Sequence, residues 1–164
     1  MIALQITELK AFMGKLLGTN TFDDFLLQEA TLQMGISYFI DGHMNEAFYQ
    51  TEEDKEDNDH KSPFIPYGEV RSTLFDLIKG KRTPLGFQVV LQLSPKRCAI
   101  IFPEGLEKHL IKGLLLNIRY DGSKAMITSG ISYSAFTLDK APELVWDEAL
   151  MSLLRNAGIS FDQL

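Results

Sequence analysis

Apolar residues recur at helical spacing in three segments of the chain. In each segment they fall at i, i+3 or i+4, i+7 and i+8, which is the pattern of a helix with one buried face. The segments are residues 9–17, 70–78 and 146–154. We predict helices there, with Thr7 as the N-terminal cap of the first. Gly18, Gly80 and Gly158 are predicted to end the three helices, because glycine adopts the left-handed conformation that often follows a helix.

Apolar residues at every second position predict two half-buried strands, at residues 30–40 and 85–93. Asp41-Gly42 and Asp121-Gly122 favour type I′ hairpin turns, in which both central residues need a positive φ. We therefore predict that residues 43–50 return alongside the first strand. Shorter apolar runs predict further strands at residues 1–6, 63–66, 114–120, 124–128 and 131–138.

Two interpretations are open for Ser94-Pro95-Lys96-Arg97. Ser followed by Pro can begin a helix, and Pro is also favoured at the second position of a type I turn. We favour a hairpin turn, because Ile100, Ile101 and Phe102 suit a strand. Residues 104–112 are expected to form a short helical connection.

These elements predict an α+β fold with about seven strands and three amphipathic helices. Most of the strands are joined by hairpins, so the sheet is predicted to be mainly antiparallel, with the helices covering its apolar face. A chain of 164 residues can bury one core, and we expect a single domain over residues 1–164. A duplication of strand, helix and hairpin, at residues 1–50 and from 63 to about 102, stays open as a finer interpretation.

Most of the net charge of −6 lies in one segment. Residues 52–59 hold six acidic residues and one lysine, so they carry −5 and leave the rest of the chain near neutral. Because the segment lacks apolar residues, burial cannot offset the entropy of ordering it, and we expect a flexible acidic loop at residues 51–62. The spacing lacks the Gly and Glu that an EF-hand loop requires, so no metal site is predicted.

Sequence features that target or cross membranes are missing. The longest uninterrupted apolar run, Cys98 to Phe102, is far shorter than the roughly 20 residues of a membrane helix. Met1 to Gln5 lacks the basic and apolar start of a signal peptide. The single cysteine cannot form an internal disulfide, and we therefore expect a cytoplasmic protein without membrane association.

Five of the sixteen Lys and Arg residues lie between positions 79 and 97. With one hydroxyl group they form the candidate contact residues Lys79, Lys81, Arg82, Thr83, Lys96 and Arg97. A phosphate-binding loop would run from a strand into a helix as Gly-x-x-x-x-Gly-Lys-Ser/Thr, whereas here the predicted order is helix, loop, strand. The cations either neutralise the negative end of the preceding helix or contact an anion, a nucleic-acid backbone or an acidic partner.

The remaining candidates have ordinary structural explanations. No catalytic motif occurs in the sequence, and no catalytic residue or cofactor is predicted. His43, His60 and His109 lack the spacing of metal ligands and are interpreted as surface residues. Cys98 opens an apolar run and is interpreted as a packed, unreactive thiol. Trp146 is interpreted as a core residue of the last helix.

Three segments resemble those of an uncharacterised family of bacterial proteins of unknown function. They are Ile-Asp-Gly-His at residues 40–43, Lys-Gly-Lys-Arg-Thr-Pro-Leu at residues 79–85 and Phe-Thr-Leu-Asp-Lys at residues 136–140. The resemblance covers nearly the whole chain and implies no activity and no site.

The predicted order of strand, helix and two strands is also similar to a domain of the sliding DNA clamps. The predicted helices carry Lys10, Lys15, Arg71 and Lys79, and in the clamps basic helices line the DNA channel. This likeness implies a clamp-like fold with nucleic-acid contact. The chain departs from the pattern, because it is too short for a full set of clamp domains and residues 146–154 add a helix.

The sequence therefore predicts a non-catalytic cytoplasmic binding or interaction protein. We expect a protein partner or self-association, with nucleic acid as a further partner. The alternative is an enzyme or small-molecule binder that recognises an anionic ligand at the basic cluster of residues 79–97, assisted by Thr83 or His43.

Overall fold

Eight strands and four α-helices form the part of the chain that the computed structural model describes, which is residues 1–49, 62–102 and 110–164. Along the chain the elements are β1 (Ala3–Ile6), α1 (Leu9–Gly18), β2 (Phe25–Gln33), β3 (Ser37–Asp41), the 3₁₀ helix η1 (Glu46–Tyr49), β4 (Ile65–Pro66), α3 (Tyr67–Ile78), β5 (Gly86–Leu93), α4 (Pro95–Ile101), β6 (Ile111–Tyr120), β7 (Ala125–Tyr133), α5 (Ala141–Asn156) and β8 (Phe161–Gln163).

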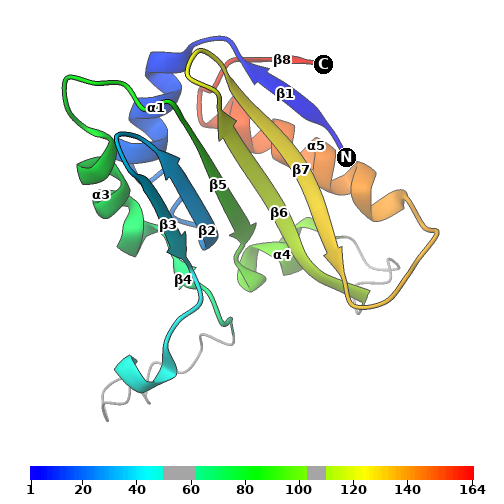
Figure 1. The fold of residues 1–164 in the computed structure, drawn as a ribbon. Coiled ribbons are helices and arrows are strands. Elements are labelled where there is room, and N and C mark those ends of the chain that lie inside the picture. The colour runs from blue at the N-terminus through cyan, green and yellow to red at the C-terminus, as the bar shows by residue number, and fades with distance from the viewer. Residues whose placement is uncertain (50–61, 103–109) are drawn as a thin grey trace.

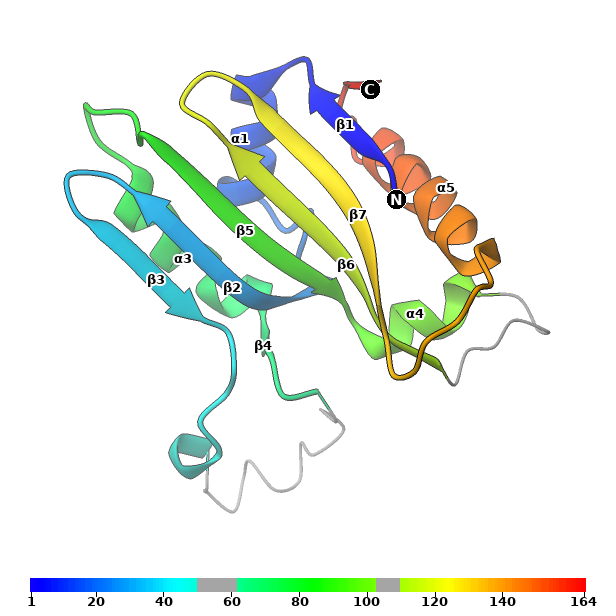
Figure 2. The same ribbon diagram turned by 45° about the vertical axis from the view of Figure 1, so that its right-hand side comes forward.

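All eight strands belong to one sheet, and every pairing in it is antiparallel. The strand order is β3-β2-β5-β6-β7-β1-β8, with β4 paired to β2 off this path. Helices α1, α3 and α5 lie behind the sheet, and its other face is open toward the viewer (Figure 1). A turned view shows the same two layers (Figure 2). The prediction of an α+β fold with a mainly antiparallel sheet is confirmed.

The core lies between the sheet and the helices. Four alternate residues of the central strand β5 are at most 4% exposed: Phe87, Val89, Leu91 and Leu93. Gln88 points the other way and is exposed, as the pleat of a strand requires. From α5, the completely buried Trp146 donates its indole N–H to the carbonyl oxygen of Leu115 at 3.0 Å. The interpretation of Trp146 as a core residue is therefore confirmed.

A buried hydroxyl group joins α3 to α1. Tyr67, at the start of α3, is completely buried, and its Oη donates to the carbonyl oxygen of Leu16 at 2.9 Å. Leu16 lies in the last turn of α1, where backbone carbonyls have no partner within the helix. Burial raises the pKa of Tyr67 well above its ordinary value, so the hydroxyl stays protonated and available to donate.

Two of the three predicted glycine terminators are confirmed. Helix α3 ends just before Gly80 and α5 just before Gly158, and these glycines have φ values of +140° and +70°. Helix α1 instead includes Gly18, which does not have a positive φ. None of the helices in the described ranges has the length and apolar content needed to cross a membrane.

The predicted N-terminal cap of α1 is wrong. The cap position is Glu8, without a side-chain hydrogen bond to the helix. Thr7 is used by the sheet instead, because its backbone N–H donates to the carbonyl oxygen of Ser160, next to the pairing of β1 with β8.

The prediction of one strand over residues 30–40 is also wrong, because these residues belong to the hairpin of β2 and β3. Gln33 pairs with Ser37, and a turn of three residues, 34–36, joins the strands. Paired residues such as Ala30 and Ile40 are both even-numbered, so even positions keep to one face on both strands. Unbroken alternation therefore cannot reveal a three-residue turn.

Gly42 follows β3 without forming the predicted hairpin turn. Its N–H donates to the carbonyl oxygen of Gln28 at 2.8 Å, and a Cβ atom at this position would lie 1.8 Å from the carbonyl oxygen of Leu27. Glycine is needed here for close backbone approach and not for a positive φ. The predicted return strand is wrong as well, because His43 forms an isolated bridge with Phe64 and η1 follows.

Helix α4 replaces the predicted hairpin turn at residues 94–97 and the strand after it. Ser94 takes the N-cap position and Pro95 the first helical position, where a missing N–H costs no hydrogen bond. Cys98, Ile101 and Phe102 then fall at i, i+3 and i+4 and pack against the core. This helical spacing is concealed in a run of residues that otherwise favours a strand.

The two strands predicted at residues 124–128 and 131–138 form one strand, β7, which ends at Tyr133. Phe136 and Leu138 follow it and are 88% and 81% exposed, so the alternation there does not correspond to burial. The sequence analysis missed β8, because a strand of three residues is too short to show a period of two.

The duplication of strand, helix and hairpin fails in its second half. The first unit is present as β1, α1 and the β2–β3 hairpin, whereas β4, α3 and β5 are followed by α4 and not by a return strand. Residues 51–61 of the predicted acidic loop, with His60, lie outside the described residues, as do His109 and residues 104–109 of the predicted helical connection. The last two residues of that connection, 111 and 112, begin β6 and are not helical.

The hydrogen bond between α3 and α1 gives a stability prediction. Tyr67→Phe removes the donor and leaves a buried carbonyl group unpaired, so we expect unfolding to become easier by about 1–3 kcal/mol. Urea denaturation followed by circular dichroism measures the change. Tyr120→Phe is the matched control, because that ring is 6% exposed and its hydroxyl has no hydrogen bond to a described residue. Equal losses in the two variants would contradict the assigned role of the bond.

Candidate functional site

The structure separates the six predicted contact residues into two groups. Lys79, Lys81, Arg82 and Thr83 precede β5, whereas Lys96 and Arg97 follow it in α4. Strand β5 has eight residues. At a rise of about 3.3 Å per residue, its two ends lie about 25 Å apart. One contact region that includes all six residues is therefore not formed.

The group after β5 is only partly available. Arg97 Nε lies 3.5 Å from a carboxylate oxygen of Asp24, with both side chains at least half exposed. Lys96 is exposed and forms no ion pair with a described residue. These two cations lie at the end of the sheet opposite Lys81 and Arg82.

The group before β5 is joined by cations from another hairpin. The N–H of Leu85 donates to the carbonyl oxygen of Gln33 at 2.8 Å, and a Cβ atom on Gly122 would lie 2.9 Å from the carbonyl oxygen of Leu85. These contacts hold the α3–β5 loop against the β2–β3 hairpin and the β6–β7 turn. Arg119 and Lys124 of the second hairpin thus lie at the same end of the sheet as the loop.

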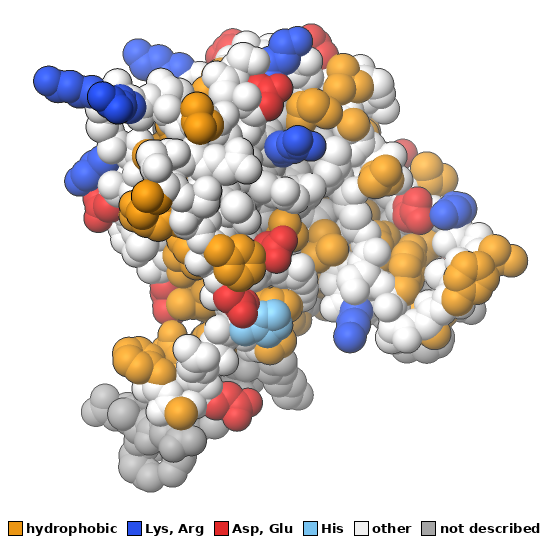
Figure 3. All heavy atoms as spheres, viewed as in Figure 1, with side chains coloured by type: hydrophobic (Ala, Val, Ile, Leu, Met, Phe, Trp, Pro, Cys, Tyr) orange, Lys and Arg blue, Asp and Glu red, His pale blue; other side chains and the backbone are white. Residues whose placement is uncertain are grey.

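We call this region the basic end and define it by Lys79, Lys81, Arg82, Arg119 and Lys124. Lys and Arg side chains project along the upper rim of the molecule, where the α3–β5 loop and the β6–β7 turn lie (Figure 3). Arg119 and Lys124 were not among the predicted contact residues, because they are far from the loop in sequence. The Asp121-Gly122 turn between them was the signal that both occupy one end of a hairpin.

The cations of the basic end differ in their partners. Lys79 Nζ lies 2.9 Å from Asp76 Oδ1, at the last turn of α3. Lys81, Arg82 and Arg119 are exposed and form no ion pair with any residue in the described ranges. Thr83 is also exposed, next to these side chains. Lys124 is likewise exposed without an ion pair to a described residue, so four unpaired cations face solvent at this end.

The carboxylate of Asp121 is occupied by its own turn. Its Oδ1 accepts hydrogen bonds from the N–H of Lys124 at 2.8 Å, and from the N–H and hydroxyl of Ser123 at 2.9 and 3.0 Å. The backbone N–H groups of Lys124 and Ser123, together with that hydroxyl, lower the pKa of Asp121. Gly122 has a φ of +96°, and the predicted hairpin is confirmed. The predicted type I′ turn is wrong, because Asp121 has no positive φ and four residues, 121–124, separate the paired Tyr120 and Ala125.

A shallow polar hollow of about 400 Å³ lies on the open sheet face beside Arg119. Gln33 and Gln88 contribute amide groups and Thr31 a hydroxyl group. Gln88 also donates to Asn117 Oδ1 across the strands at 3.1 Å. The hollow therefore combines one guanidinium group with neutral donors and acceptors, and Asp121 also lines it, with its Oδ1 already bound within its own turn. The guanidinium and amide groups can bind a phosphate or carboxylate group.

Farther from the basic end, amide groups continue across the open face. Gln28 Nε2 donates to Gln92 Oε1 at 2.7 Å. Toward the other end of β2 and β3 the same face carries two exposed carboxylates, those of Glu29 and Asp41, which lie opposite each other in the ladder. An extended partner that left the basic end would meet hydrogen-bonding groups and not further cations.

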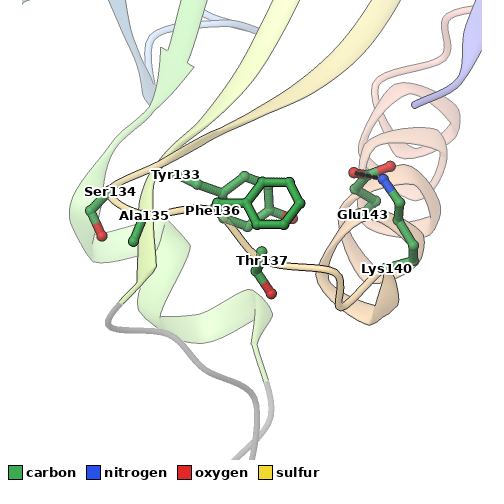
Figure 4. Close-up of a pocket in the computed structure, with 7 residues that line it drawn as sticks. All are labelled: Tyr133, Ser134, Ala135, Phe136, Thr137, Lys140 and Glu143. Carbon is green, nitrogen blue, oxygen red and sulfur yellow. Dashed lines mark hydrogen bonds and ion pairs between the residues drawn. The ribbon is translucent and has the colours of Figure 1, made fainter.

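A second hollow, of about 550 Å³, lies between the end of β7 and the start of α5 (Figure 4). Tyr133 and Phe136 line it from the strand side, while Lys140 and Glu143 form an ion pair of 3.1 Å on the helix side. Burial raises the pKa of Tyr133, and the hydrogen bond from Lys140 lowers the pKa of Glu143. Among the described residues that line it, Lys140 is the one cation and it is already paired, so this hollow offers less to an anion than the one beside Arg119.

The other candidates lie away from both hollows. His43 Nδ1 is 2.6 Å from Asp41 Oδ1 at the far end of β3, with both side chains about 60% exposed. It does not approach Thr83, so the two cannot assist one common site. Burial raises the pKa of the Cys98 thiol, in agreement with a packed, unreactive cysteine. Within the described residues no group of His, Cys, Asp and Glu could hold a metal ion.

A model of one protein family, described as a family of unknown function (DUF5721), matches residues 15–162. The chain belongs to this family. The resemblance to an uncharacterised family is therefore confirmed, and DUF5721 covers the whole sheet except β1 and the last residue of β8. No curated protein and no solved structure matches the chain, and the likeness to a sliding-clamp domain is not confirmed.

The turn of Asp121 gives a prediction on pH dependence. Its pKa is lower in the folded protein than the ordinary value of about 3.9, so its contribution to stability is present above that pH and is lost as the pH falls through the folded value. The unfolding free energies of the wild type and Asp121→Asn should therefore converge below about pH 4. Carbon-detected NMR titration measures the pKa directly.

Ser123→Ala is the graded control for Asp121, because it removes one of the three donors. The pKa of Asp121 should then move part of the way back toward its ordinary value. A pKa at or above about 3.9 in the wild type would contradict the assigned hydrogen bonds.

Proposed function

We propose that the protein is a non-catalytic cytoplasmic binding protein and that its basic end contacts the phosphate groups of a nucleic acid. The observation that carries the proposal is the set of exposed, unpaired cations Lys81, Arg82 and Arg119 beside the open sheet face. Such cations bind phosphates by charge and by release of counterions, without a deep pocket. Membership in DUF5721 assigns no activity.

The distribution of the cations favours a polymer over one small anion. Lys81 and Arg82 come from the α3–β5 loop, Arg119 from β6 and Lys124 from the β6–β7 turn. They come from three separate segments, and of these cations only Arg119 lines the hollow on the open face. A chain of phosphates can contact all of them at once, whereas a single phosphate cannot.

The amide groups beside Arg119 support the same partner. Gln33 and Gln88 line the hollow next to the guanidinium group. Side-chain amides donate to phosphate and sugar oxygens and also bind base edges. A strand lying along the rim would thus contact both charge and hydrogen-bonding groups.

A second candidate is a small phosphate- or carboxylate-bearing ligand in the hollow beside Arg119. The specific observation in its favour is the volume of about 400 Å³, lined by Arg119, Gln33, Gln88 and Thr31. This candidate corresponds to the predicted alternative of a small-molecule binder or enzyme. Its ligand would bind at Arg119 and not at the predicted cluster of residues 79–97. Binding would then depend on Arg119 and not on Lys81 or Arg82.

The proposal predicts salt-dependent binding that is lost at one end of the molecule only. Fluorescence anisotropy with a labelled single-stranded or double-stranded oligonucleotide measures affinity between 50 and 200 mM salt. Lys81→Gln with Arg82→Gln removes two phosphate contacts, so the slope of log K against log salt should flatten by about 2 and affinity at low salt should fall.

Lys96→Gln with Lys112→Gln is the matched control, because it removes the same charge from exposed positions at the opposite end of β5 and β6. Its affinity should stay close to that of the wild type. No binding at low salt, or equal losses in the two double variants, would refute nucleic-acid contact at the basic end. Binding of a mononucleotide as tightly as an oligonucleotide, abolished by Arg119→Gln alone, would favour the small ligand.

A further inference from the structure

Strand β3 is the outermost strand at one edge of the sheet. It pairs with β2 on one side, and no described strand lies on the other (Figure 2). It has five residues, and its outward-facing backbone groups are open to a further strand.

The hydrogen bonds that flank the β2–β3 ladder show which backbone groups face outward. The N–H of Met34 donates to the carbonyl of Ile36, and the N–H of Gly42 to that of Gln28. In an antiparallel ladder, such bonds flank a pair of opposite residues whose own backbone groups do not bond to each other. Here those pairs are Gln33 with Ser37 and Glu29 with Asp41. Because the two kinds of pair alternate along a ladder, Thr31 with Phe39 is a third pair of this kind.

The N–H and C=O groups of Ser37, Phe39 and Asp41 therefore point away from β2. Edge strands of natural proteins are usually protected by lysine, proline, a bulge or short length. Strand β3 contains neither lysine nor proline, and its ladder with β2 has no register shift. The opposite edge, β8, has only three residues and carries the exposed carboxylate of Asp162. Of the two sheet edges that the described residues form, β3 is therefore the longer one and the one more open to pairing, although Asp41 at its end is also exposed.

We propose that β3 pairs in antiparallel fashion with β3 of a second copy of this chain, around a two-fold axis at Phe39. In this register Phe39 lies opposite its own copy as a hydrogen-bonded pair. Ser37 and Asp41 of each copy then face each other, so all outward-facing residues of the strand are paired.

The side chains of β3 are complementary in this register. On the open face, the two Phe39 rings, each 67% exposed in the single chain, cover each other. On the other face, the half-buried Tyr38 lies opposite Ile40. Each Asp41 carboxylate lies opposite a Ser37 hydroxyl, which can donate to it. A register centred on Asp41 would instead place two carboxylates opposite each other, which is unfavourable.

The expected dimer is weak. A pair of five-residue strands buries less than the about 1,200 Å² of a typical stable interface, so the dimer should depend on concentration. The two-fold axis runs through the joined sheet, which keeps both open faces on one side. Self-association at β3 does not use the cations of the basic end, so it stands independently of the proposed function.

Sedimentation equilibrium of the full chain over a range from micromolar to millimolar concentration tests the proposal. We expect the mass to rise from monomer to dimer. Phe39→Lys should keep the protein monomeric, because it places two like charges on the axis, and its exposure allows the chain to fold. Ile100→Lys is the control, since Ile100 is 74% exposed on α4, away from β3, and this variant should still dimerise.

Cysteine variants test the register. Cα atoms opposite each other in a hydrogen-bonded pair are about 5.5 Å apart, within the range that a disulfide spans. Phe39→Cys should therefore give a cross-linked dimer under mild oxidation, while Asp41→Cys should not. A wild-type chain that stays monomeric at every concentration would overturn the proposal and leave this edge to an extended peptide. Equal dimerisation of Phe39→Lys and Ile100→Lys would also overturn it.

Discussion

Burial of one face of the antiparallel sheet is the constraint on which the rest of the structure depends. Along β5 every second side chain enters the core beneath the helices, where residues such as Leu91 are completely buried. The pleat then forces the side chains between them to the other face. Gln88 and Gln92 occupy those positions and satisfy their amides with neighbours across the strands. The one-sided core thus produces the open polar face beside the basic end.

The parts of the fold that the sequence predicted are those where periodicity and local chemistry agree. Buried stripes of helical spacing located α1, α3 and α5, and the glycines after α3 and α5 have the positive φ that their position requires. The hairpin at Asp121-Gly122 was also found, although only Gly122 has the positive φ and the turn is not type I′. In each case the residues that give the pattern also make the contacts that stabilise it.

The parts that failed are those where one pattern fits two structures. After a three-residue turn, even-numbered residues still point to the same face of the sheet as before it. The alternation from Ala30 to Ile40 is therefore the same for one strand and for a hairpin. In α4 the residues Cys98, Ile101 and Phe102 have helical spacing inside a run with strand propensity. Packing against the core decides such cases, and a single sequence does not contain that information.

The contact residues of the candidate site were predicted because they are close together in sequence. A strand between them separates such residues in space. An extended strand moves the chain by about 3.3 Å per residue, so Lys96 is carried to the opposite end of β5 from Lys81. Strand pairing has the reverse effect, because it brings Arg119 of β6 opposite Gln88 of β5. The cations that share a surface could be identified only once the order of strands in the sheet was known.

The geometry of β3 connects the open face with the basic end. The strand starts at the basic end and finishes at the other, so an antiparallel pair of copies points the two basic ends in opposite directions. The open faces form one surface between them, where amide groups such as those of Gln28 and Gln92 are paired with each other. The exposed carboxylates of Glu29 and Asp41 lie on this surface near β3, so a polyanion lying across it would be repelled there. Its attachment would then depend on the cations at the two ends and not on the strands that it crosses.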